Sequence, residues 1–97
     1  LERNTYLEWG ENDTIVVRLH WTNIITLYPD GRYRLTNGGY STNVTKDRLN
    51  EYGPADIYQK NFEWFVQLKN RSVPFENGML FNSRGEILKE KYHERVG

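Results

Sequence analysis

The segment that decides the fold reads T-N-I-I-T-L-Y-P-D-G-R-Y-R-L-T over residues 22–36, N-G-G-Y-S-T over 37–42 and N-V-T-K-D-R-L-N over 43–50. In its first part, apolar and polar residues alternate on either side of P-D-G. Proline presets φ at the first turn position and glycine accepts a positive φ, so this tripeptide favours a tight turn. The pattern predicts an antiparallel hairpin of strands 24–28 and 32–36.

The remainder of this segment predicts a polar loop followed by a short helix. Gly38-Gly39 permits backbone conformations that other residues avoid. Thr45 is the predicted N-cap of a helix over 46–52, because a threonine oxygen can accept a bond from the first helical amides. Gly53-Pro54 ends that helix, since proline cannot continue it.

A further strand is expected before the central segment. The sequence T-I-V-V-R-L over 14–19 is rich in β-branched residues and alternates, which places Val17 on the core face and Val16 on the solvent face. Residues 1–9 form either a short strand or a frayed end. Gly10 and the polar residues that follow it predict a turn.

A second hairpin is expected after the helix. Residues 56–60 and 62–68 alternate, so Phe62 would share the core face with Trp64 and Val66. A turn and a loop follow. Two short strands at 79–82 and 86–88 are expected to pair, and the charged residues 89–97 predict a frayed tail or a solvated helix.

Together these elements predict an α+β fold, with a small twisted antiparallel sheet of five to seven strands, meander-like, and one short helix. The length of 97 residues predicts a single domain over 1–97, with 1–9 and 89–97 expected to fray. The predicted core consists of alternating inward-facing residues: Ile15, Val17, Leu19, Ile25, Leu27, Tyr33, Leu35, Leu49, Ile57, Trp64, Val66 and Met79.

Charge and composition exclude several classes of protein. The 13 basic and 13 acidic residues cancel, which argues against a generally basic nucleic-acid binder and against an acidic DNA mimic, and leaves a local patch open. The chain has no Cys, so disulfide and thiolate chemistry are excluded. No apolar run approaches the roughly 20 residues of a membrane helix, so no membrane partner is expected.

Several short pieces in a fixed order resemble a group of small bacteriophage and prophage proteins. They are N-I-I-T-L-Y-P-D-G, L-T-N-G-G-Y-S-T, T-K-D-R-L-N, E-W-F-V and P-F-E-N-G-M, and they span about residues 22–79. The group's His-x-Thr opening is matched in part, by His20 two residues before Thr22. The resemblance implies a viral accessory or genome-maintenance setting in the cytoplasm of an infected host cell, and it implies no catalytic residues.

The first candidate site is polar and basic. A glycine loop exposes backbone N–H groups and a helix start adds its positive end, which together suit an anion. The side chains could bind phosphates, with Tyr40 stacking on a base. The alternative interpretation is a plain connector beside a solvated charged face. The candidate nucleic-acid or anion-binding residues are Arg32, Arg34, Gly38, Gly39, Tyr40, Ser41, Thr42, Thr45, Lys46, Arg48 and Asn50.

The second candidate site is an exposed aromatic patch for a protein partner, formed by Trp21, Tyr58 and Phe65 with Phe75 beside them. The alternative is that these rings belong to the core, an interpretation that suits Phe75 better than Trp21, because Trp21 lies in a turn.

Catalytic and metal motifs are missing from the sequence. It has two histidines, no HExxH and no paired carboxylate spacing, so no cofactor and no metal are expected. A constellation of His20, Ser41 and Asp47 can be assembled from residue types alone, and no motif requires it.

The sequence thus predicts a small viral accessory module that binds DNA, RNA or a protein that handles nucleic acid. The alternatives are a virion or assembly component, or an inhibitor of a host protein, acting through the aromatic patch. A small hydrolase-like enzyme is the third alternative. The oligomeric state is not predicted.

Overall fold

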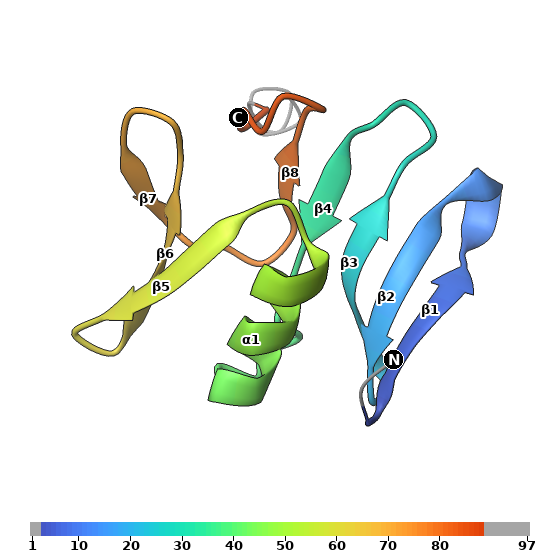
Figure 1. Ribbon diagram of the computed structural model, residues 1–97, viewed down its shortest axis with the longest axis horizontal. Helices are drawn as coiled ribbons and strands as arrows, with labels where there is room; N and C mark the ends of the chain where they lie inside the picture. The colour runs from blue at the N-terminus through green and yellow to red at the C-terminus, as the bar shows by residue number, and fades with distance from the viewer. Residues whose placement is uncertain (1–2, 89–97) are drawn as a thin grey trace, which may run out of the picture.

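The computed structural model describes residues 3–88, and within them eight strands and one α-helix form an α+β fold, as predicted (Figure 1). The predictions for residues 89–97, and for residues 1 and 2, lie outside the described residues. A 3₁₀ turn, Glu11–Asp13, joins the first two strands. In chain order the other elements are β1 (Thr5–Trp9), β2 (Ile15–Leu19), β3 (Thr22–Leu27), β4 (Tyr33–Leu35), α1 (Asn43–Tyr52), β5 (Asp56–Lys60), β6 (Glu63–Gln67), β7 (Ser72–Pro74) and β8 (Met79–Phe81).

The strands of the described part form two antiparallel sheets, of five and three strands, where the sequence had predicted one sheet of five to seven. The larger sheet has the order β1-β2-β3-β4-β8, and the smaller has the order β5-β6-β7. Helix α1 contacts β5, β3 and β2, so it lies between the two sheets (Figure 1). The helix redirects the chain after β4, and the chain returns to the larger sheet only at β8, beside β4.

A β-bulge in β3 explains why the core contains a residue that alternation did not predict. Val17 pairs with Ile25, but the next residue, Arg18, pairs with Asn23, so Ile24 is the extra residue of the bulge. As a result Ile24 and Ile25 are both fully buried. A period of two cannot anticipate this, because the bulge depends on the partner strand.

The prediction that Val16 is exposed to solvent is wrong. Val16 follows the alternation and points away from the Val17 side, but the β1–β2 connection covers it and it is buried. A Cβ atom built on Gly10 would lie 3.1 Å from the Val16 Cγ1 atom, which shows how closely the connection packs there. Thr14 is buried in the same connection and donates a hydrogen bond to the Glu11 carbonyl (2.7 Å).

Helix α1 begins three residues earlier than predicted. Its N-cap is Thr42, whose Oγ1 accepts a hydrogen bond from the Thr45 amide at 3.2 Å, and Thr45 is a buried residue of the first turn. Both residues are threonines three positions apart, so composition alone could not select between them. The end of the helix is as predicted, since the Gly53 amide donates to the Leu49 carbonyl at 2.9 Å.

The prediction that Phe62 lies on the core face is wrong. Asn61 and Phe62 form the two-residue turn between β5 and β6, with φ of 53° and 66°, and the Phe62 side chain is 95% exposed. Two positive φ values match the twist of an antiparallel hairpin, so the turn overrides the alternation of the strand. Residues 72–74, predicted as turn and loop, form β7 and pair with β6.

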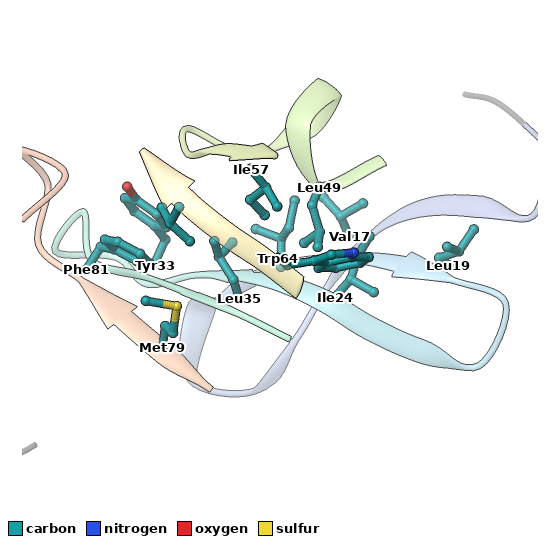
Figure 2. Close-up of a cluster of buried hydrophobic side chains, with 12 residues drawn as sticks. Val17, Leu19, Ile24, Tyr33, Leu35, Leu49, Ile57, Trp64, Met79 and Phe81 are labelled. Carbon is teal, nitrogen blue, oxygen red and sulfur yellow. The ribbon is translucent and has the colours of Figure 1, made fainter. Parts of the chain in front are cut away.

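The core joins both sheets and the helix (Figure 2). Leu49 of α1, Leu35 of β4 and Val66 of β6 are fully buried within it. The Tyr33 and Phe81 rings stack with centroids 4.9 Å apart. Ile15 and Leu27 are only half-buried, while Ile24 and Phe81 are core residues that the sequence did not predict. The other predicted core residues are confirmed as buried: Val17, Leu19, Ile25, Tyr33, Leu35, Leu49, Ile57, Trp64, Val66 and Met79.

Candidate functional site

A cavity of about 450 Å³ opens between the β2–β3 turn, the loop after β4 and the first turn of α1. We call it the Trp21–Tyr40 groove, after the two aromatic residues at its rims. Its lining contains no Asp, Glu, Lys or Arg side chain. The buried side chains of Leu19 and Ile24 contribute apolar surface to the lining. The lining residues are Leu19, His20, Trp21, Thr22, Ile24, Asn37, Tyr40, Thr42, Val44 and Thr45.

The first rim is set by the two-residue turn between β2 and β3. His20 has a φ of 54°, and its amide donates to the Asn4 carbonyl at 2.8 Å. The His20 carbonyl accepts a hydrogen bond from the Arg18 guanidinium. These contacts fix the backbone of the turn and leave the Trp21 side chain 91% exposed.

The second rim is formed by the glycine loop. Gly38 has a φ of +63°, and a Cβ atom there would lie 2.6 Å from the Thr22 Cγ2 atom, so the loop packs directly on β3. Asn37 is buried, and its amide donates to the Asn77 Oδ1 atom at 2.8 Å. The anchored loop leaves the Tyr40 side chain 62% exposed, and Tyr40 lines the groove together with Thr22 of β3.

The amides of the glycine loop already have acceptors inside the protein. The Gly38 amide donates to Thr36 Oγ1 (3.2 Å), the Gly39 amide to Asn37 Oδ1 (2.7 Å) and the Tyr40 amide to the Asn37 carbonyl (2.9 Å). The predicted anion site assumed that these amides were exposed. An anion would therefore have to compete with three existing hydrogen bonds.

The five-stranded sheet divides the predicted basic residues. Tyr33 and Leu35 point into the core, so Arg34 between them lies on the opposite face. Arg34 donates to the Tyr28 hydroxyl (3.2 Å) and to the Gly78 carbonyl (2.8 Å). Arg32 forms an ion pair with Asp30 at 2.8 Å and lies over the Tyr28 ring.

Two other predicted cations lie on α1. Arg48 donates through Nε to the Thr5 hydroxyl at 3.0 Å, which attaches the helix to β1. Lys46 lies in the first turn of α1, on the same element as the groove residue Thr45. The structure therefore does not bring Arg32, Arg34, Lys46 and Arg48 into one patch.

The Asn50 side chain makes hydrogen bonds within the fold. Its Nδ2 donates to the Ile57 carbonyl at 2.8 Å, and its Oδ1 accepts from the Ile57 amide at 2.7 Å. This pair of bonds attaches the end of α1 to β5.

The structure also separates the aromatic residues that were predicted to form one patch. Tyr58 and Phe65 stack with centroids 5.7 Å apart on the three-stranded sheet, and neither lines the groove. Phe75 packs edge-on against Trp64 at 5.3 Å, in agreement with the core interpretation. Trp21 instead lies with Tyr40, Thr42 and Thr45, which the sequence had assigned to a different site.

Five groove residues, from β2, β3, the loop after β4 and the first turn of α1, were not predicted from the sequence: Leu19, Thr22, Ile24, Asn37 and Val44. The one available signal was Val44, an apolar residue in an otherwise polar helix start.

The residues of the imagined catalytic constellation are not gathered in one cavity. His20 lines the groove, whereas Ser41 lines a second cavity of about 260 Å³ beside Trp64, and Asp47 lines neither. The Ser41 hydroxyl accepts a hydrogen bond from Asn37 Nδ2 at 3.3 Å. Within residues 3–88 no three His, Cys, Asp or Glu side chains are grouped to hold a metal ion.

The structure is that of a small α+β protein with an open groove whose lining contains no Asp, Glu, Lys or Arg. Residues 2–82 match the family described as Kyanoviridae Gp96 protein, so the chain belongs to this phage protein family. The predicted resemblance to phage proteins is confirmed at this level. No curated protein and no solved structure matches the chain. None of the helices within residues 3–88 is both long and apolar enough to cross a membrane.

Proposed function

We propose that this phage protein is a non-catalytic binding module, and that the Trp21–Tyr40 groove receives an uncharged, apolar segment of a partner protein. The observation that carries the proposal is the groove itself, with its apolar lining and two exposed aromatic rims. Exposed Trp and Tyr side chains are the residues that most often dominate the energy of protein interfaces.

The charge of the groove supports a protein segment over a polyanion. No acidic or basic side chain other than His20 contributes to the lining. Two arginines of β2 and α1 are engaged elsewhere, since Arg18 pairs with Glu8 and Arg48 bonds Thr5. Because a polyanion gains most of its affinity from free cations, this lining favours an uncharged ligand.

The size of the groove suits one or two large side chains. Pockets for compact ligands span about 300–1,000 Å³, and the cavity lies at the lower end of that range, at about 450 Å³. The hydroxyls of Thr42 and Thr45 are bonded to each other at 3.0 Å, so they demand no polar partner from the ligand. The fitting ligand is an extended segment with an aromatic or branched aliphatic anchor.

Single-stranded nucleic acid is the second candidate, and one observation favours it. Trp21 and Tyr40 are both exposed and line the same groove, so a base could stack on them, with Lys46 on the adjacent helix as the cation. This second candidate keeps the nucleic-acid role that the sequence predicted.

The two candidates can be tested in one experiment. The full chain is screened against a displayed library of random peptides, and the best peptide is titrated beside an oligothymidylate. We expect an uncharged peptide with an apolar anchor, and a loss of affinity of about tenfold or more for Trp21→Ala and Tyr40→Ala. Tyr58→Ala is the matched control, because this exposed ring lies outside the groove and should leave the affinity unchanged.

Binding of the oligothymidylate that weakens with salt and with Lys46→Ala would replace the protein-segment proposal with the nucleic-acid one. If neither ligand binds, or if Trp21→Ala leaves both affinities unchanged, the groove is not the binding surface.

A further inference from the structure

Strand β1 is an open edge of the five-stranded sheet. It pairs with β2 on one side, and no strand of residues 3–88 pairs with it on the other. Its side chains include Leu7, 61% exposed, and Trp9, 78% exposed. A sheet edge with exposed apolar side chains presents unpaired backbone groups to any strand of matching shape.

The other edges in the described part of the chain are protected, and β1 is not. Strand β8 is covered by a bridge between Phe81 and Ile87, and the Leu88 amide donates to the Leu80 carbonyl. Strand β7 has three residues and ends at Pro74. Strand β5, the other edge of the smaller sheet, ends with Lys60, and the Asn50 side chain bonds both the amide and the carbonyl of Ile57. Strand β1 contains no Pro and no Lys, and its register with β2 is free of bulges. Proline, lysine and bulges are the devices by which proteins block edge pairing.

We propose that β1 pairs with β1 of a second copy of this chain, antiparallel and about a two-fold axis at Leu7. The pairing would join the two five-stranded sheets into one. In this register Leu7 faces Leu7 of the second copy, Thr5 faces Trp9, and Tyr6 faces Glu8. A contact in which each residue meets its symmetry equivalent or exchanges partners is the hallmark of a closed dimer.

The charge on β1 supports this register. Glu8 is the one charged residue of the strand, and Arg18 neutralises it through bonds of 3.1 and 2.9 Å. An axis at Leu7 sets Glu8 opposite Tyr6, whereas an axis at Glu8 would oppose two carboxylates, which is unfavourable for directly facing residues. The register about Leu7 therefore avoids the repulsion that the register about Glu8 would create.

The apolar side chains of β1 lie on the same face of the sheet as the core residue Val17, which pairs with Leu7. Alternation places Leu7 and Trp9 on the side of Thr5, which is buried and bonded to Arg48 of α1. Thr5 is already buried within its own chain, so pairing would mainly cover the exposed Leu7 with its equivalent. None of the residues of β1 lines the Trp21–Tyr40 groove, so this surface is independent of the proposed function.

The test is the mass of the full 97-residue chain in solution, measured by light scattering or sedimentation over about a hundredfold range of concentration. We expect the mass to rise from one chain to two. Leu7→Lys should raise the dissociation constant at least about tenfold, because two lysines would face each other. Phe62→Lys is the matched control, since Phe62 is exposed and lies in a turn outside β1.

A charge-swap experiment tests the register. Leu7→Lys and Leu7→Glu should each be monomeric alone and should form a mixed dimer when combined, because residue 7 faces residue 7 in the proposed pair. Circular dichroism checks that both variants stay folded. A chain that is monomeric at every concentration, a Leu7→Lys variant that dimerises as well as the parent, or a mixture that fails to pair would each overturn the proposal.

Discussion

At the scale of single residues, Gly38 determines where the glycine loop lies. Both Gly38 and Gly39 have positive φ, as the sequence predicted for special backbone positions, but their surroundings differ. A Cβ atom on Gly38 would lie 2.6 Å from Thr22 Cγ2, whereas one on Gly39 would meet nothing within 4 Å. Gly38 is therefore required both by its conformation and by the approach of the loop to β3.

We predict that Gly38→Ala lowers the free energy of unfolding by about 2–4 kcal/mol, from backbone strain together with the clash against Thr22. Gly39→Ala is the matched variant and should lose about 1 kcal/mol, since it carries the strain alone. Urea denaturation measures both. Equal losses for the two variants would show that the contact between Gly38 and Thr22 has no energetic consequence.

At the scale of elements, a side-chain pair helps to attach β1 to β2. Arg18 donates to both carboxylate oxygens of Glu8 and lies over the Tyr6 ring at 4.3 Å. The hydrogen bond from Arg18 lowers the pKa of Glu8 below its ordinary value of 4.5. The pair is exposed to solvent, so its contribution is small and is screened by salt.

The lowered pKa of Glu8 predicts the sign of a pH effect. The folded state binds this proton less readily than the unfolded state, so the stabilisation is present above pH 4.5 and is lost as pH falls through the folded pKa. We predict that Glu8→Gln flattens the fall in the urea midpoint below pH 4.5, compared with the parent chain. Glu11→Gln is the control, because Glu11 forms no ion pair with another of residues 3–88. Parent and Glu8→Gln curves of the same slope would contradict the prediction.

At the scale of the whole molecule, the two sheets share one core. Leu35 and Phe81 of the larger sheet, Val66 of the smaller sheet and Leu49 of the helix belong to the same buried cluster (Figure 2). A shared core couples the elements, because neither sheet can lose its partner without exposing apolar surface. We therefore expect the two sheets to unfold together.

Tryptophan fluorescence can test this coupling. Trp64 is 7% exposed in the smaller sheet, whereas Trp9 and Trp21 are already largely exposed, so the change in emission on unfolding reports mainly on Trp64. We predict that the fluorescence and far-ultraviolet circular dichroism transitions in urea coincide. Replacing Trp9 and Trp21 by Phe leaves Trp64 as the single reporter and provides the control. An earlier fluorescence transition would show that the smaller sheet unfolds on its own.

The residues that sequence reasoning placed correctly are those that depend on near neighbours. Alternation identified Tyr33 and Leu35 as core residues, and Gly53 ended the helix as expected. The errors arose where a partner segment intervened. The bulge at Ile24 depends on β2, and the burial of Val16 depends on the turn at Gly10. The groove was predicted only in fragments, because Trp21 and Tyr40 are distant in sequence.

By itself the sequence determined the α+β class, most of the core, the hairpins and the resemblance to phage proteins, because periodicity, turn chemistry and motif order are local properties of a chain. Only the tertiary structure decided that the strands form two sheets, that the arginines lie on separate faces and that Trp21 meets the Tyr40 loop. Those outcomes depend on which segments pack together, and packing free energy is shared among residues far apart in the chain.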